Sequence, residues 1–141
     1  MIVRADNWVN AIALTPDQRI VLIEQYRSGT GEVTLEIPGG IIDGTETPEE
    51  AGLRELREES GYAGRTAELI GSVHPNPAFM TNRAYTVLVR DVEWVGDLQQ
   101  DDGEDIAVRL VPLAQIPELI RTGAITHAIV IAAFYLFEVT R

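Results

Sequence analysis

The chain of 141 residues contains no lysine and no cysteine, so all 11 of its basic side chains are arginines. Without lysine it has neither a Schiff-base amine nor the lysine of a G-x-x-x-x-G-K phosphate loop. Without cysteine it has no thiolate nucleophile, no disulfide and no cysteine-bound zinc. Aspartate and glutamate number 22, and the formal net charge is −11. Such acidity argues against a nucleic-acid partner, because binding to its phosphate backbone requires clustered basic side chains.

Segments able to enter a membrane are also lacking. The ten-residue apolar run Ala128–Phe137 is about half of the ~20 residues that a transmembrane helix needs, so we expect a buried core helix and no membrane partner. The N-terminus lacks the apolar stretch of a signal peptide, which leaves the cytoplasm as the expected compartment. The chain is 45% hydrophobic and shows no repeat or linker, which predicts one globular domain over residues 1–141.

Apolar segments separated by turn residues predict runs of strands with a few helices between and after them. One helix has clear ends, because Thr47-Pro48-Glu49-Glu50 forms a capping box and Gly61 supplies a left-handed stop. The order of elements favours an α+β domain, an α/β/α sandwich with a sheet between helices. The predicted strands are 9–14, 20–26, 33–37, 67–73, 84–89 and 106–111, and the predicted helices are 48–60, 114–122 and 126–138.

The helix 48–60 carries three acids that do not favour its stability. Glu55, Glu58 and Glu59 share one face, where like charges cost roughly 0.2–0.5 kcal/mol per pair. They also lie near the C-terminal end, where the helix dipole favours cations. A solvated acidic face is the simplest interpretation. The arginines on the same helix and the glycine turn before it favour another, in which carboxylates and backbone carbonyls form an oxygen-only site suited to Mg²⁺ or Mn²⁺.

Gly40, Glu46, Arg54 and Gly61 stand at fixed spacings around these three acids. Together these residues resemble the Nudix box, the signature of a hydrolase family. The resemblance implies the Nudix fold and a metal-dependent hydrolase that cleaves the diphosphate of a nucleoside diphosphate linked to another group. Only Tyr62 departs from the pattern, which prefers an aliphatic residue there. The fixed positions of the box, all present at the family spacing, are Gly40, Glu46, Arg54, Glu55, Glu58, Glu59 and Gly61.

The resemblance also implies roles for individual residues. Glu55, Glu58 and Glu59 are expected to be ligands of Mg²⁺, with Mn²⁺ as a possible substitute, and the carbonyl of Gly39 is expected to be a further ligand. Glu58 and Glu59 are also candidates for the catalytic carboxylate. Arg54 and Glu46 are expected to form an ion pair that holds the loop to the helix.

Outside the box, the segments Val21–Arg27 and Leu35–Gly40, together with Pro77, are similar to the ADP-ribose pyrophosphatase group. That similarity implies hydrolysis of ADP-ribose to AMP and ribose 5-phosphate by a homodimer. In the acidic segment 101–105, Glu104 is the first candidate for a general base or an extra metal ligand, with Asp102 second. A solvated loop is the alternative.

Two residues are expected to contact the substrate. Arg27 is a candidate for binding the base or a phosphate, with a surface ion pair as the alternative, and Phe79 is a candidate for stacking on the base, with burial as the alternative. Three other functions stay open: hydrolysis of a nucleotide sugar such as GDP-mannose, hydrolysis of a nucleoside triphosphate, and binding as a non-catalytic sensor. Because all box carboxylates are present, the sensor is the least favoured of these.

Overall fold

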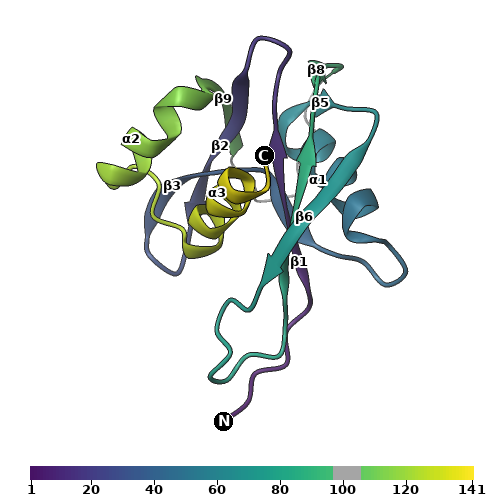
Figure 1. Cartoon of the computed structure of the whole chain (residues 1–141). Helices are drawn as coiled ribbons and strands as arrows, with labels where there is room; N and C mark the ends of the chain where they lie inside the picture. The colour runs from purple at the N-terminus through teal and green to yellow at the C-terminus, as the bar shows by residue number, and fades with distance from the viewer. Residues whose placement is uncertain (97–105) are drawn as a thin grey trace.

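The computed structural model describes residues 1–96 and 106–141 and has an α+β fold, in which helices lie on both sides of a mixed sheet (Figure 1). This arrangement confirms the predicted fold class. The strands are β1 (Trp8–Ala13), β2 (Arg19–Arg27), β3 (Glu32–Glu36), β4 (Gly39–Ile41), β5 (Tyr62–Ala63), β6 (Ala67–Val73), β7 (Ala84–Val89), β8 (Glu93–Trp94) and β9 (Ile106–Pro112). The helices are α1 (Pro48–Ser60), the 3₁₀ turn η1 (Leu113–Gln115), α2 (Ile116–Arg121) and α3 (Ala128–Thr140).

The strands of the described residues form one mixed sheet and two antiparallel ones. The mixed sheet has the order β4-β1-β7-β6, with β1 parallel to β7 and antiparallel to β4. A second sheet has the order β3-β2-β9, and β5 pairs with β8. Strand β4 is therefore an edge strand whose single neighbour in the mixed sheet is β1.

Strand β1 is buried on both faces. Ile12, and Leu14 directly after the strand, belong to the apolar cluster that contains the buried side chains of α3. Val9, Ala11 and Ala13 belong to the cluster that contains the buried side chains of α1. Because successive strand residues point to opposite faces, this alternation places α3 on one face of the sheet and α1 on the other.

Helix α1 has the ends that the sequence predicts. The Thr47 side chain accepts a hydrogen bond from the backbone N–H of Glu50, and the Glu50 side chain accepts one from the N–H of Thr47. Gly61 ends the helix in the left-handed conformation, with φ 75°, and its N–H donates to the carbonyl of Arg57. The acidic face therefore lies on a helix whose two ends are both fixed by hydrogen bonds.

Other elements differ from the prediction. The segment 114–122 is a 3₁₀ turn followed by the six-residue α2, because Pro117 lies at the start of α2, where the ring is compatible only with the first helical turn. The last helix begins at Ala128 instead of residue 126, since His127 is still extended. Strands β4, β5 and β8 were not predicted. Within the described part of the chain, no helix has both the length and the apolar character that crossing a membrane requires.

Candidate active site

Strand β4 and the C-terminal half of α1 bring two predicted metal ligands together. The Glu59 side chain is almost completely buried, with 6% of the residue exposed, and its Oε1 accepts a hydrogen bond of 2.7 Å from the Gly39 N–H. The N–H and C=O of one strand residue point to the same edge. The Gly39 carbonyl therefore also faces away from β1, on the side where Glu59 lies.

Arg54 holds the loop before α1 to the helix, as predicted. Its guanidinium makes two hydrogen bonds to Glu46, Nε to Oε2 at 2.7 Å and Nη2 to Oε1 at 2.9 Å. Hydrogen bonds from Arg54 hold the pKa of Glu46 below its ordinary value. In turn, the carboxylates of Glu46 and Glu55 raise the pKa of Arg54 above its ordinary value. The Nη1 atom of Arg54 contacts both Glu55, at 2.9 Å, and Glu58, at 3.2 Å. The Arg54 guanidinium thus holds Glu46 of the loop together with two predicted metal ligands, Glu55 and Glu58.

Gly40 is needed for the position of Glu55. A Cβ atom on Gly40 would lie 2.3 Å from Oε1 of Glu55 and 2.4 Å from its Cδ. The Glu55 carboxylate therefore packs directly against the backbone of β4. Only glycine leaves the space that this approach requires.

The donor set fits a hard divalent cation, because it consists of carboxylate and carbonyl oxygens. The Arg54 guanidinium already lies between the carboxylates of Glu55 and Glu58, so this pair accepts a positive charge. As the side chains stand, residues 1–96 and 106–141 contain no group of three or more His, Cys, Asp or Glu side chains close enough to hold a metal ion together. The set of Gly39, Glu55, Glu58 and Glu59 therefore stays a prediction.

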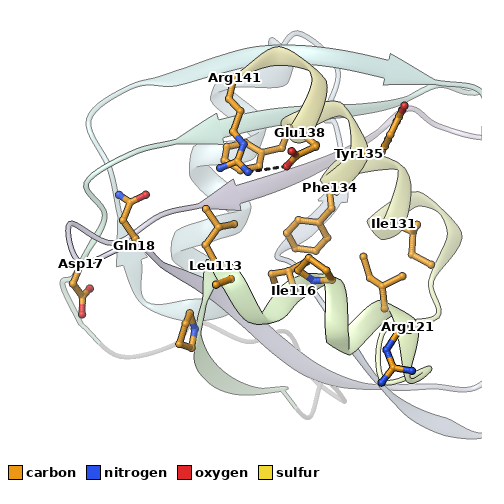
Figure 2. A pocket seen from close by; sticks show the side chains of 15 residues that line it. Asp17, Gln18, Leu113, Ile116, Arg121, Ile131, Phe134, Tyr135, Glu138 and Arg141 are labelled. Atoms are coloured by element: carbon orange, nitrogen blue, oxygen red, sulfur yellow. Dashed lines mark hydrogen bonds and ion pairs between the residues drawn. The ribbon is translucent and has the colours of Figure 1, made fainter.

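Two cavities differ in their relation to the box. A groove of about 340 Å³ borders α1 and is lined by Arg54, Arg57 and Glu58 among others. A larger apolar cavity of about 960 Å³ lies between α2 and α3, where Ile116 and Phe134 face each other (Figure 2). The box carboxylates do not line this larger cavity. Of the box carboxylates, Glu58 lines the smaller groove, whereas Glu55 and Glu59 line neither cavity.

Arg27 lies in an ion pair between β2 and β3. Its Nε and Nη2 donate to the two carboxylate oxygens of Glu36 at 2.8 and 2.6 Å, and the Thr34 hydroxyl also donates to that carboxylate. Glu36 is 2% exposed. Burial opposes its ionisation, but the hydrogen bonds from Arg27 and Thr34 outweigh burial and hold the pKa of Glu36 below its ordinary value of 4.5. The ion-pair alternative is thus realised, with a buried partner, while the substrate contact of Arg27 stays a prediction.

The variant Glu36→Gln is expected to lower the free energy of unfolding by about 1.5–3 kcal/mol near neutral pH, because it removes the negative charge that holds the Arg27 guanidinium by two hydrogen bonds. The folded-state pKa of Glu36 is depressed, so its contribution is present above the unfolded pKa of about 4.5 and is lost as the pH falls through the folded value. Urea unfolding of both proteins between about pH 7 and about pH 3 tests this, and the difference should shrink on the acid side.

The matched control for Glu36→Gln is Glu24→Gln on the neighbouring strand. Glu24 pairs with Arg109 at 3.1 Å, and both side chains are exposed. Removing its charge is expected to change the free energy of unfolding by at most about 1 kcal/mol. Equal losses in the two variants would contradict a special contribution from the buried pair.

The remaining predicted residues are not joined to the box by the described contacts. Phe79 is 38% exposed and lies in the segment between β6 and β7, where its carbonyl accepts a hydrogen bond from the N–H of Val3. Its stacking on a base stays a prediction. Glu104 and Asp102 lie outside the described residues, so their roles also stay predictions.

Asn10, on β1, was missed as a residue of this region. It is 2% exposed, and its Oδ1 lies 2.6 Å from the position that a Cβ atom on Gly39 would take. The available signal was a single polar residue inside an otherwise apolar buried strand, since such a side chain must find hydrogen-bond partners.

The chain belongs to the NUDIX domain family, whose pattern matches residues 7–134. Among its relatives, an ADP-ribose pyrophosphatase of Bacillus subtilis is 27% identical over 128 residues, which are 90% of this chain and 69% of that protein. An ADP-sugar pyrophosphatase of Mus musculus is 34% identical over 125 residues, 84% of this chain and 57% of that protein. An ADP compounds hydrolase, NudE of Escherichia coli, is 27% identical over 128 residues, 89% of this chain and 68% of that protein.

A solved structure supports the same grouping. The crystal structure of an ADP compounds hydrolase matches with a TM-score of 0.85 and 25% sequence identity, covering 94% of this chain and 70% of that one. The chain thus spans between 57% and 69% of the length of the three relatives named above. Nudix hydrolases as a family require a divalent metal, in agreement with the oxygen donors on α1 and β4.

Proposed function

We propose that the protein is a Mg²⁺-dependent hydrolase that cleaves the diphosphate of ADP-ribose to give AMP and ribose 5-phosphate. The observation that carries the proposal is the junction of β4 and α1, where Gly39 meets Glu59 and Arg54 holds Glu55 and Glu58. The relatives named for ADP-ribose and ADP-sugar hydrolysis support the substrate class. An acidic chain without lysine would need a metal between its carboxylates and the diphosphate.

In the proposed reaction, the Gly39 carbonyl and the carboxylates of Glu55, Glu58 and Glu59 would hold Mg²⁺, with Mn²⁺ as a substitute. The ion would neutralise the phosphate charge and make water a better nucleophile. A carboxylate would accept the proton of the attacking water as its oxygen bonds to one phosphorus and the bond from that phosphorus to the bridging oxygen breaks, so that the other phosphate leaves. Glu104 is the first candidate for this carboxylate, with Glu58 or Glu59 as the alternatives.

The other residues would bind and position the substrate. The Arg27 side chain, which is 30% exposed and pairs with Glu36, would contact a phosphate or the base of the substrate. Phe79 is partly exposed and would stack on the base. The proposal includes a single domain over residues 1–141, a homodimer and a cytoplasmic location, which rest on the resemblance to ADP-ribose pyrophosphatases and on the sequence features described above.

A substrate panel tests the proposal. The purified protein is incubated with Mg²⁺ or Mn²⁺ and ADP-ribose, ADP-glucose, GDP-mannose or a deoxynucleoside triphosphate, and products are separated by ion-exchange chromatography. We expect AMP and ribose 5-phosphate from ADP-ribose, and no turnover with excess chelator. Faster turnover of GDP-mannose or of a triphosphate would overturn the substrate assignment. Binding of ADP-ribose without turnover would instead indicate a sensor.

ADP-sugars are the second candidate substrates, because the mouse relative is named for them and is 34% identical. A second readout comes from running the reaction in water labelled with a heavy oxygen isotope. The label enters the product whose phosphorus is attacked by water. A label in AMP alone or in the sugar phosphate alone would identify the phosphorus that is attacked. Comparison of kcat/KM for ADP-ribose and ADP-glucose then decides between the two substrates.

A further inference from the structure

Asn10 occupies a position in β1 where an apolar residue would be expected. Its neighbours Val9, Ala11 and Ile12 are all 0% exposed, and Asn10 itself is 2% exposed. Burying an amide costs free energy unless its hydrogen bonds are made. A polar side chain at this depth thus calls for partners, and the described residues supply them.

The Asn10 amide is held by two hydrogen bonds from different parts of the chain. Its Oδ1 accepts from the indole Nε1 of Trp8 at 2.9 Å, and its Nδ2 donates to the carbonyl of Ile129 at 3.2 Å. Ile129 lies in the first turn of α3. The amide therefore links β1 to the start of the C-terminal helix.

The same amide lies against the strand that carries the predicted metal ligand. Asn10 is the cross-strand partner of Gly39 in the antiparallel pairing of β1 with β4. A Cβ atom on Gly39 would come within 2.6 Å of the Asn10 Oδ1 and 2.9 Å of the Trp8 Nε1. Both polar atoms thus fill the space where a side chain at position 39 would stand, and they limit the movement of Gly39 toward α3.

On its other side, Gly39 contacts the box helix, because its N–H donates to Glu59 at 2.7 Å. A continuous chain of contacts therefore runs from α3 through Asn10 and Gly39 to Glu59 on α1. We propose that Asn10 is a positioning residue for the divalent-metal site: pinned by Trp8 and the Ile129 carbonyl, it sets the place of Gly39 and thereby of Glu59. This inference rests on the proposed function, since it concerns the metal that the proposed reaction requires.

The test measures the affinity of the whole protein for Mn²⁺ without substrate. The concentration of free Mn²⁺ is read from its electron paramagnetic resonance signal. The variant Asn10→Leu keeps a similar side-chain volume and removes both hydrogen bonds. We expect its Mn²⁺ affinity to fall about tenfold, the lower end of the loss that follows removal of a residue supporting metal ligands. Hydrolysis of ADP-ribose should recover at high Mg²⁺, because the defect lies in metal binding.

The matched control is Asn82→Leu. Asn82 is 8% exposed, and its Nδ2 donates to the Asp6 carbonyl at 3.1 Å, just before β7. This variant loses the same kind of hydrogen bond, and we expect its Mn²⁺ affinity to equal that of the wild type. An equal loss of affinity in both variants would show general loosening of the fold and would overturn the positioning role.

A milder variant keeps the proposal testable when Asn10→Leu does not fold. Trp8→Phe keeps the aromatic ring and removes the N–H that fixes the Asn10 amide, so a smaller loss of Mn²⁺ affinity is expected. If Asn10→Leu folds and binds Mn²⁺ as tightly as the wild type, the positioning role is overturned and the proposed function stands. If Trp8→Phe alone folds, wild-type affinity in that variant has the same meaning. Failure of the wild-type protein itself to bind Mn²⁺ would overturn the metal assignment and this inference together.

Discussion

The variant Glu59→Gln is expected to lower kcat for ADP-ribose by about 10²–10³-fold at saturating Mg²⁺, the size that follows loss of one group stabilising transition-state charge. Glutamine keeps the length of the side chain, and its Oε1 still accepts a hydrogen bond from the Gly39 N–H. It removes the negative charge that would neutralise the metal. Because the buried contact at 2.7 Å is kept, the melting temperature should change little. Steady-state kinetics and a thermal melt of the same preparation measure both effects.

The control for this change is Glu49→Gln, which alters the same charge in the first turn of the same helix. Its expected effect is a loss of helix-dipole stabilisation of about 0.3–1 kcal/mol with unchanged kcat. If Glu59→Gln retained the turnover of the wild type, Glu59 would not be a metal ligand or a catalytic carboxylate. The buried Glu59 would then have a structural role, to which its hydrogen bond to Gly39 contributes.

The box helix could be predicted from sequence because its signals are local. The capping box at Thr47 and Glu50 and the glycine at position 61 lie within the element they define, so no distant partner decides its ends. The pairing of Arg54 with Glu46 was expected from the resemblance and is confirmed at 2.7 and 2.9 Å. Local chemistry and the family pattern thus agree on this part of the site.

Strand β4 could not be predicted, because two of its three residues are glycines and glycine is depleted in strands. The strand exists because its backbone pairs with β1, about thirty residues earlier, and because glycine permits the close approach of Asn10 and Glu55. Non-local pairing of this kind leaves no periodicity in the segment itself. The supporting role inferred for Asn10 depends on the same register.

The partner of Arg27 shows a second limit of sequence reasoning. Glu32 is the residue directly across from Arg27 in the pairing of β2 with β3, yet the guanidinium fork binds Glu36 further along β3. Local pairing rules would have favoured Glu32. Glu36 is buried while Glu32 is exposed, and a buried carboxylate gains more from a cation than a hydrated one does.

The variant Gly40→Ala is expected to reduce activity far more than stability. The new Cβ atom would lie 2.3 Å from Oε1 of Glu55, so the carboxylate must move. The clash is with the far end of a flexible side chain, and Gly40 does not have positive φ, so β4 itself need not shift. We expect kcat/KM to fall about 10- to 100-fold and the Mg²⁺ requirement to rise, as for loss of a group that orients metal ligands.

The free energy of unfolding of Gly40→Ala should change by less than about 1 kcal/mol, because alanine reduces the entropy of the unfolded chain where the backbone conformation allows it. Gly29→Ala is the matched control, since a Cβ atom there meets nothing within 4 Å. It should leave both activity and Mg²⁺ dependence unchanged. Wild-type activity in Gly40→Ala would mean that the Glu55 carboxylate has no fixed position in the reaction. A stability loss as large as the activity loss would mean that the strand, and with it Gly39, had moved instead of Glu55.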